Sequence, residues 1–254
     1  MELISRARVK YLRSLGQKKV RASEGRLVVE GANGVEAAIA SGCADELYLS
    51  EEALATERGA RLRESGVPVS MLDRGDAEKL GETRTPAGIF ALARSPLASF
   101  GELRWDDRAT LLVADGVADP GNFGTLVRSA AALGCDGVVV TAGSVEPTNP
   151  KAVRATAGAI FRLPVAPATR ADVRAAGFEL WVADKAGEPL GAIRGRPPRV
   201  ALLVGNEPRG VAPDAHAESD RAVAIPLSAG VESLNVAVAA GILLHALGAM
   251  AVAS

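Results

Sequence analysis

Short, almost uninterrupted apolar runs alternate with helix-like stretches through the second half of this 254-residue chain. Leu111–Asp115, Gly137–Thr141 and Val200–Val204 are rich in Val, Leu and Ala. Strands buried on both faces have this composition, whereas strands with one wet face alternate apolar and polar residues. Aromatic residues make up only 4% of the chain, which disfavours an aromatic-rich sandwich. The alternation predicts an α/β fold with a parallel sheet covered by helices on both faces.

The first part of the chain shows a separate α/β alternation, which ends before a stretch rich in Pro, Ser, Gly and charge. We therefore predict a smaller N-terminal α/β domain over 1–94, a linker over 95–109 and a larger C-terminal domain over 110–254. Helices are expected over 3–16, 31–41, 51–65, 75–80, 122–133, 151–157 and from 234 onward, and a basic turn over 17–21. Strands are expected over 26–30, 46–50, 67–72, 88–93, 111–115, 137–141, 163–165, 178–183, 200–204 and 222–225.

Two loops follow apolar runs within the stretch Leu202–Ala239. The first is a Gly-Asn-Glu-Pro-Arg-Gly turn, and the second is a Gly/Ser loop that leads into a long apolar helix. Such loops leave many backbone amides and carbonyls free. In open α/β sheets, ligands bind at the carboxyl ends of the strands. The stretch therefore predicts a small-molecule pocket.

The N-terminal arm is basic, although the net charge of the whole chain is −1. Eight basic residues stand against two acidic ones in residues 1–26, so this arm carries +6 and the remainder −7. A basic arm on a near-neutral protein favours a polyanionic partner. A solvated helix face is the alternative, because basic patches are common.

The sequence lacks the motifs that are typical of several other classes of protein. No GxGxxG follows the first strand of either domain, and no Walker loop, HExxH or GxSxG occurs. Cys43 and Cys135 are too few for a disulfide framework or a zinc site and suit a reducing compartment. The charged N-terminus is unlike a signal peptide. The uncharged segment 234–253 contains Asn235 and His245 and lacks flanking basic residues, so we expect a buried or interface helix rather than a membrane span.

Two polar clusters are expected at helix starts in the C-terminal domain. Asn122 is placed to cap a helix by accepting from the amide of Thr125, and Arg128 follows about two turns along it. A helix start of this kind favours an anion or an oxygen-rich ligand. Lys151 and Arg154 share one helix face, which suits either phosphates or solvent. Considered alone, Arg128 is expected to pair with a surface acid.

Three motifs, read in chain order, resemble those of a known family. They are DPGNFGTLVRSA at 119–130, VGNEPRG at 204–210 and IPLSAGVESLNVAVA at 225–239. Together they resemble the motifs of the SpoU (TrmH-type) RNA 2'-O-ribose methyltransferases of the SPOUT superfamily, over about 105–254. Segments 27–31 and 85–90 resemble more weakly the ribosomal-protein-like substrate-binding domain that many of these enzymes carry.

The resemblance implies a trefoil-knotted C-terminal SPOUT domain that binds S-adenosyl-L-methionine in the knot and works as a homodimer. General folding rules alone would argue against a knot. The implied catalytic arginine acts across the dimer, with the partner's cofactor, and no metal is expected. The implied cofactor-binding residues are Val204, Gly205, Ile225, Leu227 and Leu234, and the implied catalytic residues are Asn122, Arg128, Glu207, Ser233 and Asn235.

The implied reaction is attack of an RNA ribose 2'-oxygen on the cofactor's methyl group. Because an arginine side chain stays protonated at ordinary pH, Arg128 is a base only in a strongly perturbing environment. Otherwise it stabilises the developing oxyanion while a phosphate or water takes the proton.

The expected substrate is 23S-type ribosomal RNA in the cytoplasm, and methylation that confers antibiotic resistance is a sub-case. A tRNA 2'-O-methyltransferase and a non-catalytic RNA-binding or ribosome-assembly factor are the alternatives. Steep salt dependence is expected if the basic residues grip RNA phosphates. The residues expected to contact RNA are Arg6, Arg8, Lys10, Lys18, Lys19, Arg21, Lys151 and Arg154.

Overall fold

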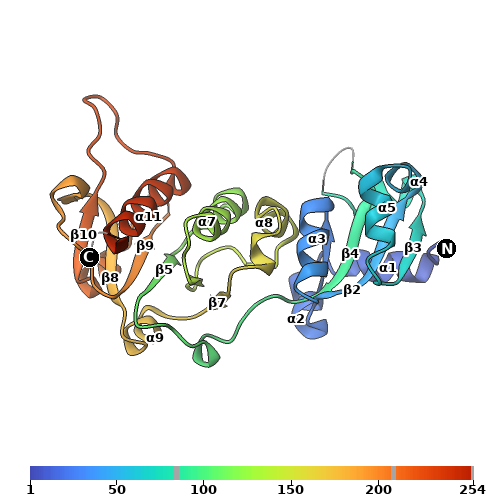
Figure 1. The fold of residues 1–254 in the computed structure, drawn as a ribbon, viewed down its shortest axis with the longest axis horizontal. Helices are drawn as coiled ribbons and strands as arrows, with labels where there is room; N and C mark the ends of the chain where they lie inside the picture. The colour runs from blue at the N-terminus through green and yellow to red at the C-terminus, as the bar shows by residue number, and fades with distance from the viewer. Residues whose placement is uncertain (83–85, 207–209, 253–254) are drawn as a thin grey trace. The chain divides into compact units, whose positions relative to one another are not determined.

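The computed structural model of the chain describes residues 1–82, 86–206 and 210–252. Two compact units are present, each with its own sheet (Figure 1). Unit 1 comprises Met1–Pro96 and Glu146–Arg162, and unit 2 comprises Leu97–Val145 and Leu163–Ser254. Residues 146–162 therefore belong with the N-terminal unit, although they lie within the C-terminal half of the sequence.

Unit 1 contains a four-stranded sheet, within the described residues, in the order β1-β4-β2-β3. Strand β4 pairs antiparallel with β1 and β2, and β2 pairs parallel with β3. Buried Leu12, Tyr48 and Phe90 lie in its core. The elements are α1 (Arg6–Ser14), α2 (Lys18–Glu24), β1 (Arg26–Glu30), α3 (Ala32–Ala40), β2 (Ala44–Ser50), α4 (Glu51–Leu54), α5 (Glu57–Arg63), β3 (Val69–Leu72), α6 (Arg74–Leu80), β4 (Ile89–Arg94), α8 (Pro150–Ala155) and the 3-10 turn η2 (Ala159–Phe161).

Two helix predictions in unit 1 need correction. The segment 17–21, predicted as a basic turn, contains the start of helix α2. Its Lys, Arg, Ala and Glu residues favour a helix, and Gly25 ends it in the left-handed conformation at φ 61°. The helix predicted over 51–65 is divided into α4 and α5, because Thr56 caps the second helix by accepting from a backbone amide.

Unit 2 contains a six-stranded sheet, within the described residues, in the order β10-β8-β9-β5-β6-β7. Each of these strand pairs is parallel, which confirms the predicted parallel sheet. Strand β9, although late in the chain, lies between β5 and β8. The elements are η1 (Phe100–Glu102), β5 (Ala109–Ala114), α7 (Pro120–Ala132), β6 (Gly137–Val140), β7 (Val165–Pro167), α9 (Arg170–Ala175), β8 (Glu179–Pro189), η3 (Leu190–Ala192), β9 (Arg199–Val204), α10 (Pro213–Glu218), β10 (Arg221–Ala224) and α11 (Val236–Val252).

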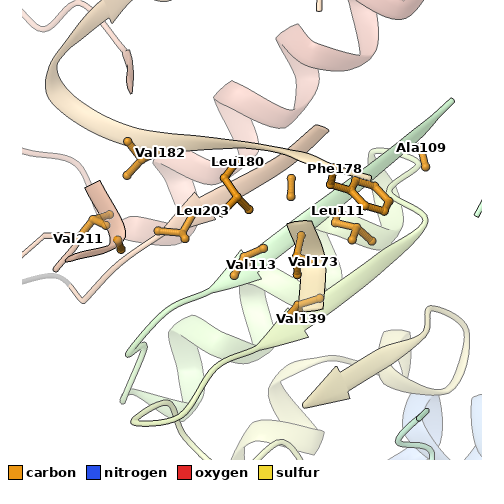
Figure 2. Packing of buried hydrophobic residues seen from close by; sticks show 12 residues of the cluster. Ala109, Leu111, Val113, Val139, Val173, Phe178, Leu180, Val182, Leu203 and Val211 are labelled. Carbon is orange, nitrogen blue, oxygen red and sulfur yellow. The ribbon is translucent and has the colours of Figure 1, made fainter. Parts of the chain in front are cut away.

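The core of unit 2 is built from alternate residues of its strands, because successive side chains point to opposite faces. Leu111, Val113 and Leu203 pack with Val173 of α9 and Ala215 of α10 in one cluster (Figure 2). Strands β5 and β9 are almost entirely buried, so both of their faces are covered. Helices α7 and α11 lie side by side over the sheet (Figure 1).

Helix α11 is apolar between Val236 and its described end except for His245, which is exposed. Among the described residues, no helix is long and apolar enough to cross a bilayer. Val238 and Ile242 remain 52% and 40% exposed, and their spacing of four residues places them on one face of the helix. An apolar surface therefore stays uncovered on α11.

Candidate functional site

A cavity of about 590 Å³ opens beside the carboxyl ends of β9 and β10 and the middle of β8. A volume of this size suits a small organic ligand. All five residues predicted to bind the cofactor line it: Val204, Gly205, Ile225, Leu227 and Leu234. The carboxyl ends of these parallel strands therefore build one pocket from segments that are distant in the sequence.

The turn that follows β9 closes tightly at its base. A Cβ atom on Gly205 would lie only 2.4 Å from the carbonyl oxygen of Gly210, so a side chain cannot fit there. The Gly210 amide donates to the carbonyl of Asn206 at 2.7 Å, and Gly210 has a φ of 64°. Glu207, a predicted catalytic residue on this turn, lies outside the described residues.

Asn235 connects the cavity wall to helix α7. Its Oδ1 accepts from the amides of Ala237 and Val238 at 3.0 and 3.3 Å, so it caps α11. Its Nδ2 donates to Oδ1 of Asn122 at 3.0 Å, and Ser233 lines the cavity. The fold thus gathers three of the predicted catalytic residues at the starts of α7 and α11.

Helix α7 begins earlier than the sequence suggested. Asp119 caps it by accepting from the amide of Asn122 at 2.7 Å, and Pro120 occupies the first turn. The capping role predicted for Asn122 is therefore wrong, because its side chain points to Asn235 instead.

Arg128 lies on the exposed side of α7, away from the residues that line the cavity. Gly121 and Thr125 share that exposed side at helical spacing. The opposite side of the helix buries Phe123 and Leu126 in the protein interior. Within one copy of the chain, the structure does not bring Arg128 into the cavity wall.

Sequence reasoning missed four polar residues of the cavity: Asn206, Glu232, and Asp184 and Lys185 on β8. Asp184 accepts from the amide of Ala186 at 2.7 Å and contacts Nε2 of His216 at 2.8 Å. Burial acts to raise the pKa of Asp184, but these two hydrogen bonds, together with the charges of His216 and Lys185, hold the pKa below its usual value. Asp184 and Lys185 directly follow an apolar run that we had predicted as a strand, and that position was the available signal.

Basic residues on unit 1 form an exposed group that faces solvent. Among the described residues, none of its members forms an ion pair. Arg13, which the sequence prediction left out, shares one exposed face of α1 with Arg6 and Lys10 because of their spacing. The exposed residues from the predicted RNA-contacting set are Arg6, Lys10, Lys18, Lys19 and Lys151.

Two other predicted RNA contacts already have acidic neighbours. Arg8 donates to Glu46 at 2.6 Å and to the Tyr48 hydroxyl at 2.9 Å. Arg154 lies 3.8 Å from a carboxylate oxygen of Glu30. Their charges are therefore partly compensated within the unit.

Arg21 corrects the RNA prediction, because its side chain is only 4% exposed. It pairs with Glu146, donates to Thr148 at 3.2 Å, and donates to the carbonyls of Leu15 and Gly16 at 2.9 and 2.7 Å. A buried guanidinium with all these partners stabilises the fold and is not available to phosphates. Nothing in the sequence indicated that residues so far apart would meet.

Comparison with known proteins identifies the family. Residues 109–245 match the SpoU rRNA Methylase family, and residues 6–91 match the MRM3-like substrate binding domain. The Bacillus subtilis (strain 168) protein 23S rRNA (guanosine(2553)-2'-O)-methyltransferase RlmP is 33% identical over 251 residues, covering 96% of this chain and 97% of that protein. The chain belongs to the SpoU rRNA methylase family.

Two further similarities support the SpoU assignment. A Streptomyces azureus 23S rRNA (adenosine(1067)-2'-O)-methyltransferase is 32% identical over 186 residues, covering 70% of this chain and 69% of that protein. The AdoMet-bound rRNA methyltransferase structure from Sinorhizobium meliloti is 27% identical, with a TM-score of 0.83 and 97% of each chain covered. The predicted family, its methyltransferase activity and its S-adenosylmethionine cofactor are confirmed.

The cavity of this SpoU methylase fits S-adenosylmethionine in composition. Val223, Val236 and Leu243 offer apolar surface to an aromatic base, and Asp184 and Glu232 offer negative charge to the cofactor's cationic groups. Gly205 and Gly210, which have no side chains, present backbone polar groups to the cavity. These residues would hold the cofactor. The hydrogen bond between Asn235 and Asn122 links the adjacent start of α11 to the start of α7.

Proposed function

We propose that this SpoU methylase transfers a methyl group to a ribose 2'-hydroxyl of 23S-type ribosomal RNA. One observation carries the proposal. The five residues of the expected cofactor set line a single cavity together with Ser233, and Asn235 links that cavity to Asn122 at the start of α7. The helix that begins there carries Arg128.

Bound S-adenosylmethionine supplies an activated methyl group. Attack by the RNA 2'-oxygen forms the new O–C bond as the C–S bond breaks, and the hydroxyl proton passes to a phosphate oxygen or water. In this scheme Arg128 stabilises the charge that develops on the 2'-oxygen. Asn122, Ser233 and Asn235 orient the reacting groups, and Glu207 completes the proposed catalytic set.

We propose that two copies of the chain form the active enzyme through the exposed face of α11. Val238 and Ile242 leave an apolar surface there, and burying such surface favours association. Arg128, which is outside the cavity wall of its own chain, would serve the cavity of the partner. The order β8-β9-β5, in which a late strand lies between earlier ones, supports the expected trefoil knot.

The N-terminal domain, 1–94, is proposed to bind the RNA substrate. Arg6, Lys10, Lys18 and Lys19 supply exposed positive charge, which attracts phosphates of a folded RNA. Lys151, from the internal segment that joins unit 1, extends this set. A cytoplasmic location is proposed with the ribosomal substrate, and the two free cysteines suit a reducing compartment.

The relatives act on different nucleotides of 23S rRNA, a guanosine in one and an adenosine in the other. The full-length similarity to the guanosine enzyme, against a partial match to the adenosine enzyme, favours a guanosine in 23S-type RNA for this chain. The choice between a housekeeping and a resistance role follows from the nucleotide that is modified.

Incubation of total rRNA and tRNA with S-adenosylmethionine labelled in its methyl group tests the proposal, followed by mapping of the modified ribose. We expect label at one 2'-O position of the large ribosomal RNA. Label in tRNA alone would favour the tRNA enzyme. If neither pool is labelled although the protein binds RNA, the chain is a non-catalytic RNA-binding factor.

A further inference from the structure

Arg170, the first residue of α9, binds three carboxylates outside the cavity. Its Nε and Nη2 donate to the two oxygens of Glu218 at 2.7 and 3.3 Å, and Nη2 also donates to Asp214 at 2.6 Å. Its Nη1 donates to the two oxygens of Asp115 at 3.3 and 3.1 Å. The side chains of Arg170 and Asp115 are 16% and 9% exposed. The planar guanidinium fork is suited to such bidentate contacts.

Arg170 supplies the positive charge that balances the three carboxylates of this cluster. The nearby Arg174 is engaged elsewhere, with the carboxylate of Asp220 and the backbone carbonyl of Glu218. The hydrogen bond to Glu218 raises the pKa of Arg170 against the effect of burial, and the bond to Asp214 adds to it. Without Arg170, three negative charges would face one another, which destabilises their arrangement.

Two of the carboxylates belong to α10, which continues directly from the cavity wall. Val211 lines the cavity and packs in the core of unit 2, and Ala212 alone separates it from the first residue of α10. His216, also on α10, contacts Asp184 in the cavity wall at 2.8 Å. A shift of α10 would therefore displace both Val211 and the partner of Asp184.

The third carboxylate lies at the end of β5. The amide of Asp115 donates to the carbonyl of Val204, a cavity residue, at 2.9 Å. Its side chain also accepts from the hydroxyl of Thr141 on the neighbouring strand end. The chain then runs from Asp115 to Asp119, the cap of α7, which carries Asn122. Asp115 is thus fixed at the junction of β5, β9 and the approach to α7.

We propose that Arg170 is a positioning residue that holds α10 against the end of β5. In this way it sets the spacing between the turn that follows β9 and the start of α7. Arg170 does not line the cavity, so its effect passes through α10 and Asp115. The inference rests on the cavity's role as the S-adenosylmethionine site.

Titration calorimetry of the full-length protein with S-adenosylmethionine tests the inference. For Arg170→Gln we expect the dissociation constant to rise by about tenfold or more. The KM for S-adenosylmethionine should rise in parallel, whereas the KM for RNA stays within about twofold of the wild type. Arg170→Lys keeps the charge but loses the fork, so its dissociation constant should fall between those of the wild type and Arg170→Gln.

Arg174→Gln is the matched control, because it removes contacts of the same helix to Asp220 and to the Glu218 backbone carbonyl but leaves the link from α10 through Arg170 to Asp115 intact. We expect its Tm to fall without a change in cofactor affinity. An Arg170→Gln protein that binds as tightly as the wild type, or an Arg174→Gln protein that loses as much affinity, would overturn the inference.

If Arg170→Gln does not fold, the Asp214→Asn/Glu218→Gln double variant replaces it. This variant keeps Arg170 and its contact with Asp115 but removes the charges on α10, and the same rise in dissociation constant is expected. Unchanged affinity in this variant would also overturn the inference. A wild-type protein that fails to bind S-adenosylmethionine would instead contradict the cofactor site itself, so the two failures are distinguishable.

Discussion

Asn235, at the start of α11, makes two different contacts. Asn235 caps the helix through its carbonyl oxygen and holds Asn122 through its amide nitrogen. A side chain used in both ways fixes the beginning of α11 relative to α7, because moving either helix would break one of the two contacts. The proposed catalytic geometry at this point therefore depends on an ordinary capping interaction.

Replacement of Arg128 by Ala should reduce methyl transfer by about a hundredfold or more, because a stabiliser of developing charge is lost. The affinity for S-adenosylmethionine should stay within about twofold, since Arg128 does not line the cavity. Methyl transfer to RNA and calorimetric binding measure the two effects. Arg194→Ala, which removes another exposed arginine of unit 2, should leave both unchanged. Normal methylation by Arg128→Ala would rule out the proposed role.

Gly205→Ala should raise the dissociation constant for S-adenosylmethionine by about tenfold or more. The reason is that the new methyl group would force Gly205 and Gly210 apart. The control is Gly101→Ala, where an added Cβ meets nothing within 4 Å. Calorimetry on both variants, with their Tm values, makes the comparison. Equal affinities in the two variants would contradict the close approach at Gly205.

At the residue scale, the sequence predicted that a ligand pocket forms from residues at the ends of strands. The pocket predicted within Leu202–Ala239 is present because a parallel sheet brings its carboxyl ends to one edge. Val204 and Ile225 line it, but their assignment to the cofactor came from the family resemblance. Asp184 lies within β8, beyond the residues that pair with β9, and was missed because its segment contains no Gly/Ser loop. The cap of α7 was misassigned because Asp119 and Asn122 are both good capping residues, and only the three-dimensional start of the helix distinguishes them.

At the scale of elements, contacts between distant segments determine stability more than helix propensity does. The buried side chain of Arg21 on α2 closes the end of α1 through two backbone carbonyls and reaches Glu146 and Thr148 ahead of α8. Three segments of unit 1 therefore share one cation. Helix α2 itself was missed because a short run of charged residues resembles a solvated turn until a partner for Arg21 is known.

Arg21→Ala should lower the free energy of unfolding by about 3–5 kcal/mol, because Glu146 would be left without its partner in a mostly buried position. Arg61→Ala is the matched control. Arg61 pairs with Glu57 on the surface of α5, and its loss should cost no more than about 1 kcal/mol. Urea denaturation measures both variants. Similar losses for the two would show that the Arg21 pair is not buried in solution.

Lys18→Gln/Lys19→Gln should weaken RNA binding and reduce the slope of log affinity against log salt by about one to two. Both side chains are exposed on α2. Lys79→Gln is the control, since Lys79 is already paired with Asp76 on α6. Binding measured over a salt series separates the cases. An unchanged slope in the double variant would favour a purely solvated surface.

At the scale of the whole molecule, the exposed face of α11 is the proposed dimer interface. Val238→Asp/Ile242→Asp should shift the protein from dimer to monomer, because burying two carboxylates in an apolar interface is costly. Sedimentation measures the mass. Val231→Asp changes an equally exposed apolar residue outside α11 and should remain dimeric. A wild-type monomer, or an intact dimer in the double variant, would exclude this face as the interface.

The two α/β units could be predicted because each has its own alternation of strands and helices. The membership of residues 146–162 could not be predicted. The apolar pattern of α8 shows that Ala152 and Val153 are buried, but such a pattern does not identify which core receives them. That information lies in long-range contacts such as the one between Arg21 and Glu146.

The chain enters unit 1 twice, first with its N-terminus and again between β6 and β7. Residues 1–96 alone are consequently not the complete unit and cannot be exchanged for those of a relative as an independent domain. A chimera that received residues 1–96 from a relative would combine a foreign α2 with the host's own Glu146 and α8. Moving the proposed RNA recognition of this chain onto another enzyme would therefore require grafting the internal 146–162 segment along with the N-terminus.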